Sequence, residues 1–194
     1  MIRALAIALL GAVLAAPAFA QRPKTPVPLP APQSSAPAAS SSPDAAFAAY
    51  QRGYFLTAFK LATDGAANKD APSMTLLGEL YANGLGVGRD DAKAVSWYKL
   101  AADHGDRNAM FALAMFAYEG RGGPRDPDTA AKYLSEAAKL GHPIAEYDLG
   151  LLYLQGQQFP QDYKRAAELL RQSAAAGSSQ AQYALGTLYK DGRG

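Results

Sequence analysis

Residues 77–105 read LGELYANGLGVGRDDAKAVSWYKLAADHG, and the same skeleton returns twice at a spacing of 36 residues. The second copy covers residues 113–141, LAMFAYEGRGGPRDPDTAAKYLSEAAKLG, and the third covers residues 149–177, LGLLYLQGQQFPQDYKRAAELLRQSAAAG. The three copies align without insertion or deletion. A fixed period of this length is typical of a stacked helical array, in which each repeat packs against its neighbours.

Each copy contains two helical patterns that are joined by a loop. In the second copy, residues 107–119 form the first pattern, with Leu113 and Phe116 on one face at helical spacing. Gly120 follows as a C-terminal glycine, which ends a helix by adopting a left-handed conformation. The second pattern begins at Asp126, a good N-cap that precedes a proline at the first helical position. The sequence therefore predicts an all-α fold of helix pairs, called helix A and helix B below.

The loop at residues 84–90 is rich in glycine and raises the question of a phosphate-binding loop. Such a loop needs a strand before it, and a lysine with a serine or threonine at the helix that follows. Here a helix precedes the loop, and no such lysine motif follows it. The equivalent loop at residues 156–162 keeps only its first glycine. We therefore interpret the loop as a turn and expect no nucleotide or other cofactor.

The positions of the acidic and histidine residues in the repeats favour a role at helix ends over a catalytic or metal-binding role. One aspartate recurs at the start of each helix B, at Asp90, Asp126 and Asp162. A catalytic carboxylate would be singular, whereas an N-cap recurs with its helix. Asp91 extends the first of these into a pair, but no further ligand lies at metal-binding spacing. His104 is expected at a helix C-terminus, and His142 as a helix cap or a surface residue. We expect no catalytic residue and no metal site, so the chain is not predicted to be an enzyme.

The repeats resemble Sel-1-like repeats, which are relatives of the tetratricopeptide repeat. The residues of the first copy that match the family pattern are Leu77, Gly78, Tyr81, Gly84, Gly86, Val87, Asp90, Lys93, Ala94, Trp97, Tyr98, Ala101, Ala102 and Gly105. The match divides the chain into repeats at residues 71–106, 107–142 and 143–178, and an incomplete repeat at residues 179–194. The resemblance implies a right-handed superhelical solenoid of antiparallel helix pairs that acts as an adaptor or scaffold in protein complexes.

The two ends of the array depart from the pattern. Residues 44–70 are expected to form a divergent N-terminal helical repeat that acts as a cap. At the other end the sequence stops at Gly194, inside the loop of the fourth repeat. Without a helix B, Tyr183, Leu185 and Leu188 would be partly bare, which indicates a truncated chain or a covering helix from elsewhere.

The first 43 residues have the composition of an export signal and a linker. Residues 1–20, MIRALAIALLGAVLAAPAFA, combine a basic start, a short apolar run and an A-x-A site. This pattern predicts a signal peptide that is cleaved after Ala20, the alternative being an uncleaved anchor. Residues 21–43 are rich in proline, alanine and serine, and we expect a disordered linker or, alternatively, a proline-rich ligand. The expected location is the periplasm or the exterior, with no integral membrane segment after cleavage.

The candidate partner-binding surface is the face of helix A where the repeats differ from one another. Core positions stay alike between repeats, while this face mixes charged, amide and apolar side chains. The residues that form this stripe are Glu79, Asn83, Met115, Glu119, Asp148, Leu151 and Gln155. In superhelical arrays helix A usually lines the concave groove, although an ordinary solvated face would show the same variability.

Composition narrows the class of partner. The net charge is +2, and the basic residues form no cluster, so nucleic acid is not an expected partner. We therefore expect an exported, non-enzymatic scaffold or adaptor that binds an unidentified protein or peptide in the cell envelope, and a periplasmic regulator is one form that such a protein takes. Two alternatives stay open. One is a cell-wall-related or β-lactam-binding hydrolase, although the chain has no cysteine and no S-x-x-K motif. The other is the repeat region of a longer multidomain protein.

Overall fold

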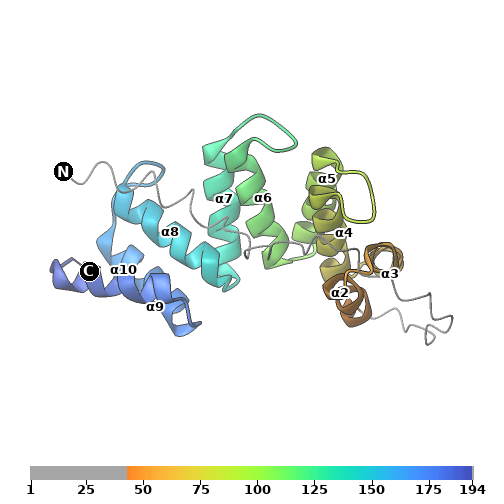
Figure 1. Cartoon of the computed structure of the whole chain (residues 1–194). Helices are drawn as coiled ribbons and strands as arrows, with labels where there is room; N and C mark the ends of the chain where they lie inside the picture. The colour runs from red at the N-terminus through yellow and green to blue at the C-terminus, as the bar shows by residue number, and fades with distance from the viewer. Residues whose placement is uncertain (1–42, 194) are drawn as a thin grey trace, which may run out of the picture. The chain divides into compact units, whose positions relative to one another are not determined.

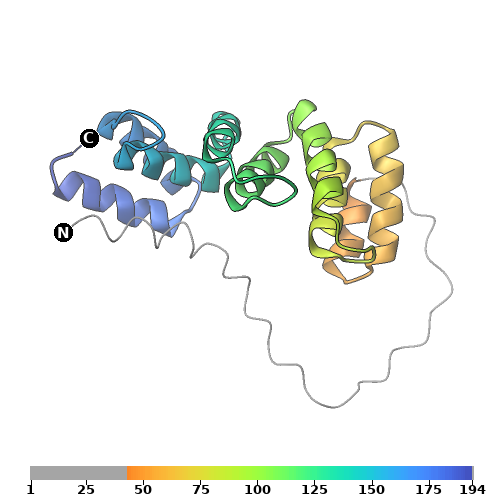
Figure 2. The same cartoon turned by 90° about the horizontal axis from the view of Figure 1, so that it is seen from above.

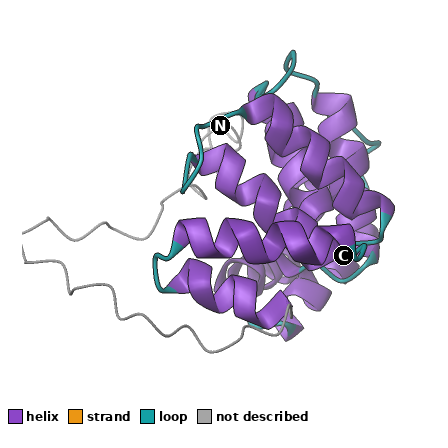
Figure 3. Ribbon diagram, turned by 90° about the vertical axis from the view of Figure 1, so that its right-hand side faces the viewer, coloured by secondary structure: helices purple, strands orange, loops and turns teal. Residues whose placement is uncertain are grey.

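The computed structural model describes residues 43–193, and this range contains helices and turns but no strand (Figure 3). The helices, labelled as in Figure 1, are α2 (Pro43–Gln51), α3 (Phe55–Ala67), α4 (Ala71–Asn83), α5 (Asp91–Asp103), α6 (Arg107–Glu119), α7 (Pro127–Lys139), α8 (Pro143–Gln155), α9 (Tyr163–Ala175) and α10 (Ser179–Lys190). The expected signal peptide and residues 21–42 of the expected linker lie outside the described residues. Helix α2 begins at Pro43, the position that the sequence analysis gave to the end of the linker.

The helices pack in the order in which they follow one another along the chain. Helices α4 and α5 form one pair, α6 and α7 the next, and α8 and α9 the third (Figures 1 and 2). Helix B of each pair then packs on helix A of the next pair, so α5 contacts α6, α7 contacts α8 and α9 contacts α10. This arrangement confirms the predicted all-α solenoid of helix pairs.

Side-chain caps start every helix of the repeats. Each helix B has the aspartate that the sequence predicted, and the carboxylate of Asp90, for example, accepts a hydrogen bond of 2.9 Å from the backbone N–H of Lys93. Asp126 and Asp162 make the equivalent bonds in α7 and α9. Because every acid at these positions satisfies a free N–H group of its own helix, the structure confirms N-capping as their role.

The loop between helix A and helix B has the same closure in all three repeats. Gly84 ends α4 in the left-handed conformation, with a φ of 66°. The backbone N–H of Asp90 then donates to the carbonyl of Tyr81 at 3.0 Å, and the equivalent bonds in the next two repeats measure 2.8 and 3.1 Å. The third loop closes in this way without the middle glycines, so the glycine-rich loop is a turn. Gly88 has an ordinary φ and open space around it, so the turn does not depend on a glycine there.

Two of the three loops also lie against the preceding repeat. A Cβ atom added to Gly86 would lie 2.9 Å from the carbonyl carbon of Phe55, at the start of α3. A Cβ atom added to Gly122 would lie 2.8 Å from the carbonyl oxygen of Asp91, at the start of α5. These distances leave no room for a side chain. The third loop has Gln158 at this position, and its side chain is exposed.

Within each pair, one side chain of helix B sits on a small residue of helix A. A Cβ atom added to Gly78 would lie 2.5 Å from the ring of Tyr98, which is itself buried. In the third repeat, Leu170 takes the place of the tyrosine, and the same construction at Gly150 gives 3.2 Å. In the second repeat, Ala114 stands in place of the glycine and belongs to the same core cluster as the helix B leucine. This contact sets how closely the two helices approach.

Both ends of the described array leave large apolar side chains exposed, and Leu56 of α3 is 73% exposed. At the N-terminal end, Ala58 and Ala62 of α3 are fully buried in a cluster with α4. At the C-terminal end, Tyr183 of α10 is 79% exposed, as expected for a helix A without a helix B. Leu188 was expected to be bare as well, and this prediction was wrong because it is only 5% exposed and packs against residues of α8 and α9.

Candidate functional site

The structure places the predicted stripe on α4, α6 and α8, with very different burial from one residue to the next. Asn83 and Glu119 are exposed, whereas Glu79, Met115, Leu151 and Gln155 are half-buried and Asp148 is buried. Within a helix, the side-chain amide of Asn83 donates to the backbone carbonyl of Glu79 at 2.9 Å. Across residues 43–193, no hydrogen bond or ion pair joins stripe residues of different repeats. Leu151 packs against the C-terminal core cluster, so it belongs partly to the core.

Asp148 is the most unusual member of this stripe. Its side chain is only 7% exposed, and among the described residues it has no hydrogen-bond or ion-pair partner. Burial in a poorly solvated place disfavours the charged carboxylate and raises the pKa of Asp148 to about 7. The sister repeats carry Leu76, Ala112 and Ala184 at this position. A carboxylate therefore stands where the other repeats have an apolar side chain.

Glu79 and Thr75 place further unpaired polar groups on α4. Burial raises the pKa of the Glu79 carboxyl, and the nearby charge of Asp106 raises it further. One turn earlier on the same helix, the hydroxyl of Thr75 is buried without a hydrogen-bond partner. Buried polar atoms are nearly always paired in folded proteins, so both groups are unusual. Only the half-buried Glu79 carboxyl is open to a donor from a ligand, because the Thr75 hydroxyl is covered by the protein itself.

His142 lies at the junction between the second and third repeats. Its Nδ1 atom accepts a hydrogen bond of 3.2 Å from the backbone N–H of Ala145, which confirms that it is a helix cap. Its ring stacks on Phe111 with 4.5 Å between ring centroids. Because the ring is buried, and because Arg107 is nearby, the pKa of His142 is lowered. The alternative of a surface histidine is therefore wrong.

Asp91, which the sequence analysis considered as half of a metal-binding pair, holds two repeats together. The guanidinium of Arg121 donates to both carboxylate oxygens of Asp91, at 2.7 and 3.2 Å, and to the carbonyl of Ala82 at 2.9 Å. The hydrogen bonds from Arg121, and then those from Arg89, lower the pKa of Asp91 to about 2. Arg121 also lies over the ring of Phe116, 4.0 Å from its centroid. The acid has a structural partner from the next repeat.

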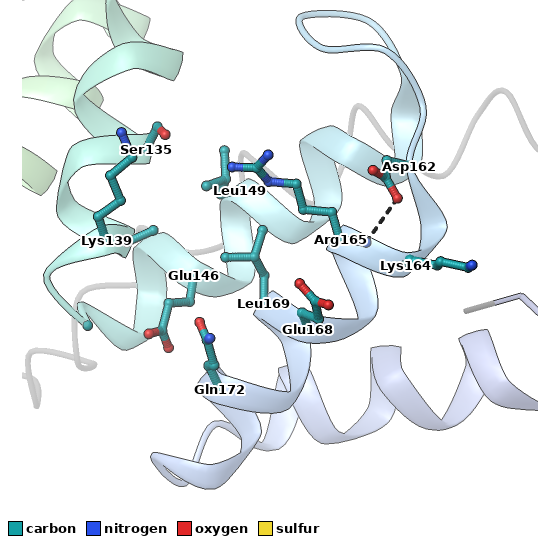
Figure 4. Close-up of a pocket in the computed structure, with 12 residues that line it drawn as sticks. Ser135, Lys139, Glu146, Leu149, Asp162, Lys164, Arg165, Glu168, Leu169 and Gln172 are labelled. Atoms are coloured by element: carbon teal, nitrogen blue, oxygen red, sulfur yellow. Dashed lines mark hydrogen bonds between the residues drawn. The ribbon is translucent and has the colours of Figure 1, made fainter.

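A pocket of about 580 Å³ lies between α7, α8 and α9, outside the predicted stripe (Figure 4). The apolar part of its wall includes the buried Ala138 and Leu149, with the half-buried Leu169 beside them. Charged side chains surround the walls. Those on the exposed rim are Lys139, Asp162, Lys164, Arg165 and Glu168.

Glu146 is the exception among the charged residues of this pocket, because it is buried. Its side chain is 6% exposed and has no hydrogen-bond or ion-pair partner among the described residues. Burial raises the pKa of Glu146, and the charge of Arg107 opposes this shift. The first two repeats carry methionine here, at Met74 and Met110. Sequence reasoning missed this residue, and the signal that could have found it is a charge where the first two repeats have methionine, although the fourth repeat also has a polar residue there, Gln182.

Across residues 43–193, no group of three histidine, cysteine, aspartate or glutamate side chains is placed to hold a metal ion. None of the helices described is long and apolar enough to cross a membrane.

Comparison with known proteins gives a family and several solved relatives. The Sel1 repeat family matches at residues 71–106, 107–142, 143–178 and 179–194. A Sel1 repeat protein from Oxalobacter formigenes is similar over 79% of this chain and 63% of its own, with 29% identity and a TM-score of 0.74. A protective antigen of uropathogenic Escherichia coli with an SLR fold is similar over 78% of this chain, with 26% identity and a TM-score of 0.68.

These relatives are longer than the region that they share with this chain. The chain spans 63% of the first and 34% of the second. The cysteine-rich protein B of Helicobacter pylori shares the fold, with a TM-score of 0.51 at 21% identity, over 74% of this chain and 96% of its own. No curated protein matches the chain.

Proposed function

We propose that this chain, which belongs to the Sel1 repeat family, is an exported, non-enzymatic scaffold that binds a protein or peptide through the stripe on α4, α6 and α8. Sel1 repeats generally serve as protein-interaction scaffolds, so protein partners are the coarse expectation. We propose in addition that the protein acts in the cell envelope and that the stripe is its binding surface. The export part is supported by the signal-like composition of residues 1–20.

The observation that carries the proposed surface is the unpaired carboxylate of Asp148. Asp148 is 7% exposed and lacks a hydrogen-bond donor, so its charged carboxylate destabilises the free protein. A destabilising group of this kind is typical of a binding site. A partner that offers an N–H group or a cation to Asp148 would supply the missing bond. The half-buried Glu79 carboxylate on α4, which also has no hydrogen-bond partner among the described residues, is a second group that a partner would pair.

The fold makes such a surface effective because its side chains are held before the partner arrives. Each helix A lies between two B helices and is capped at its start, so the backbone under the stripe is ordered in the free protein. Binding then loses little conformational entropy on the scaffold side, and most of the interaction energy remains as affinity.

The test compares partner capture by wild type and by a variant that changes the stripe but not the fold. We would use Glu79→Gln/Met115→Ala/Asp148→Asn and leave Leu151 intact, because Leu151 packs partly in the core. The matched control is Lys99→Gln/Lys132→Gln, which changes exposed residues of α5 and α7. The stripe variant should lose the partner that wild type and control capture from an envelope fraction. Equal capture by all three proteins would show that the stripe is not the binding surface.

The export proposal has a separate test that does not depend on the partner. The full chain, produced in a bacterial host with an envelope, should be found outside the cytoplasm with Gln21 as its first residue, as read by mass spectrometry of the intact protein. Recovery from the cytoplasm with residues 1–20 still attached would contradict it.

A further inference from the structure

The pocket between α7, α8 and α9 lies on the opposite side of α8 from the stripe. Successive residues of a helix are about 100° apart around its axis, so Glu146 and Leu149 lie on one side. Asp148 and Leu151 lie roughly on the other side by the same geometry. Figure 4 shows Glu146 and Leu149 lining the pocket together with side chains of α7 and α9. The helix therefore presents two separate surfaces.

The pocket has an apolar wall and a buried charge at one end. Leu149 and Leu169 line it together with Glu146 and Gln172 (Figure 4). Lys139 and Ser135 come from α7 on the other side. A ligand that filled the pocket would contact both the two leucines and Glu146, so an apolar stem with a polar head suits it.

The Glu146 carboxyl is available for such a head because nothing in the described chain occupies it. The exposed cations of the rim form no ion pair with it, although Lys139 lies on the same pocket. Arg107 is close enough to influence its charge, but the Arg107 guanidinium donates instead to the carbonyl of Gly141 at 2.7 Å. A buried charge without a partner is costly, and a cation brought by a ligand would remove that cost.

We propose that this pocket accepts a lysine or arginine side chain of the protein or peptide partner, with its cationic head on Glu146 and its aliphatic stem along Leu149 and Leu169. This inference rests on the proposed function as an interaction scaffold and adds a second contact and its chemistry. Lysine and arginine combine a long aliphatic stem with a charged head, which is the combination that the pocket requires.

The rest of the pocket suits the peptide backbone around that side chain. A volume of about 580 Å³ exceeds what one basic side chain fills. The exposed rim cations Lys139, Lys164 and Arg165 favour an acidic residue next to the basic one. Asp162 and Glu168, also on the rim, add two further negative charges to that of Glu146.

The test is a titration of the isotope-labelled full chain with Nα-acetyl-L-arginine amide, followed by amide NMR shifts. The uncharged isostere Nα-acetyl-L-citrulline amide is the control ligand. Arginine amide should shift residues 145–149 and 166–172, and citrulline amide should bind at least tenfold more weakly. Equal binding of the two ligands would overturn the proposal, and so would amide shifts confined to residues outside these two ranges. This test uses the protein with its sequence unchanged.

A variant then assigns the effect to the carboxyl. Glu146→Gln keeps the size of the side chain and removes its charge, and it should weaken arginine binding at least tenfold. Asp64→Asn, an exposed site on α3, is the matched control and should change nothing. Unchanged binding by Glu146→Gln would overturn the proposal.

The two proposals fail separately. If Glu146→Gln captures the envelope partner as well as wild type does, and the stripe variant does not, the pocket proposal is wrong and the scaffold proposal stands. If the stripe variant captures the partner normally and Glu146→Gln does not, the binding surface is this pocket and the stripe proposal is wrong.

Discussion

The first repeat and α10 carry a glycine at the same position, and only the first repeat uses it. At Gly78 the ring of Tyr98 fills the space where a Cβ atom would be. At Gly186 nothing lies within 4 Å of that place among the described residues. The two glycines are identical in sequence pattern and differ in their neighbours. A position in the repeat therefore acquires its structural role from the helix that packs on it.

The largest expected loss of stability comes from adding a methyl group at Gly78, where the ring of Tyr98 already fills the space. Gly78→Ala would force a methyl group into the buried Tyr98 ring, which also packs edge-on against Phe116 at 5.4 Å. We expect the unfolding free energy to fall by about 3 kcal/mol, because overpacking of this kind outweighs the gain in helix propensity. Chemical denaturation of the variant measures this loss.

A second change should restore what the first one removes. The second repeat already combines Ala114 with Leu134, so Gly78→Ala/Tyr98→Leu copies a pair that the chain itself contains. The double variant should recover most of the lost stability. If it is no more stable than the single variant, the ring of Tyr98 is not the cause of the loss.

The next effect concerns the contact that joins the first two repeats. Asp91→Asn removes the charge that Arg121 and Arg89 bind, and should lower the unfolding free energy at pH 7 by about 1 to 2 kcal/mol. Because the pKa of Asp91 is lowered to about 2 in the folded protein, this stabilisation is present above pH 4 and is lost as the pH falls toward 2. Urea denaturation at pH 7 and at pH 2.5 should therefore show a smaller difference between wild type and variant at the lower pH. A difference that grows on acidification would contradict the proposed ion pair.

A smaller effect of opposite sign is expected at the open site. Gly186→Ala adds a methyl group where there is space, and replaces glycine inside a helix, so α10 should gain about 1 kcal/mol. Hydrogen exchange of the α10 amides measures this gain directly, because the end of the array can open on its own. Slower exchange in α10, with unchanged exchange in α4, is the expected result. Faster exchange would mean that the site is filled in solution.

The smallest net effect should occur at Gly150. Its Cβ atom would lie 3.2 Å from the side chain of Leu170, which is close but leaves the flexible leucine able to shift. The cost of this contact and the gain in helix propensity are both on the order of 1 kcal/mol and should nearly cancel. The melting temperature of Gly150→Ala should stay close to that of wild type. If Gly150→Ala lost as much stability as Gly78→Ala, the difference in size between Leu170 and Tyr98 would not explain how the two repeats differ.

The sequence was sufficient for features that depend on neighbours in the chain. The helix pairs, the aspartate caps and the closing glycines are local, because a cap or a C-terminal glycine acts within its own turn. The 36-residue spacing then implied the stacking, since identical units must pack in identical ways.

Features that depend on distant residues could not be predicted. The burial of His142 follows from Phe111, 31 residues earlier, while the sister repeats have Asp106 and Ser178 at the histidine position and indicate a simple cap. The seven-residue stripe followed from helical periodicity, but periodicity does not give the burial of Asp148, which depends on side chains brought by neighbouring helices. Whether the stripe binds a partner stays a prediction.

The loops that touch the preceding repeat determine where this protein tolerates added sequence. Gly86 and Gly122 lie against the starts of α3 and α5, so a peptide tag inserted beside either one would push apart two repeats. The third loop lacks this contact, and Gln157 and Gln158 are exposed. An epitope or fluorescent reporter for following the protein in cells is therefore best inserted between Gln157 and Gln158, where it does not disturb the contacts between a loop and the preceding repeat.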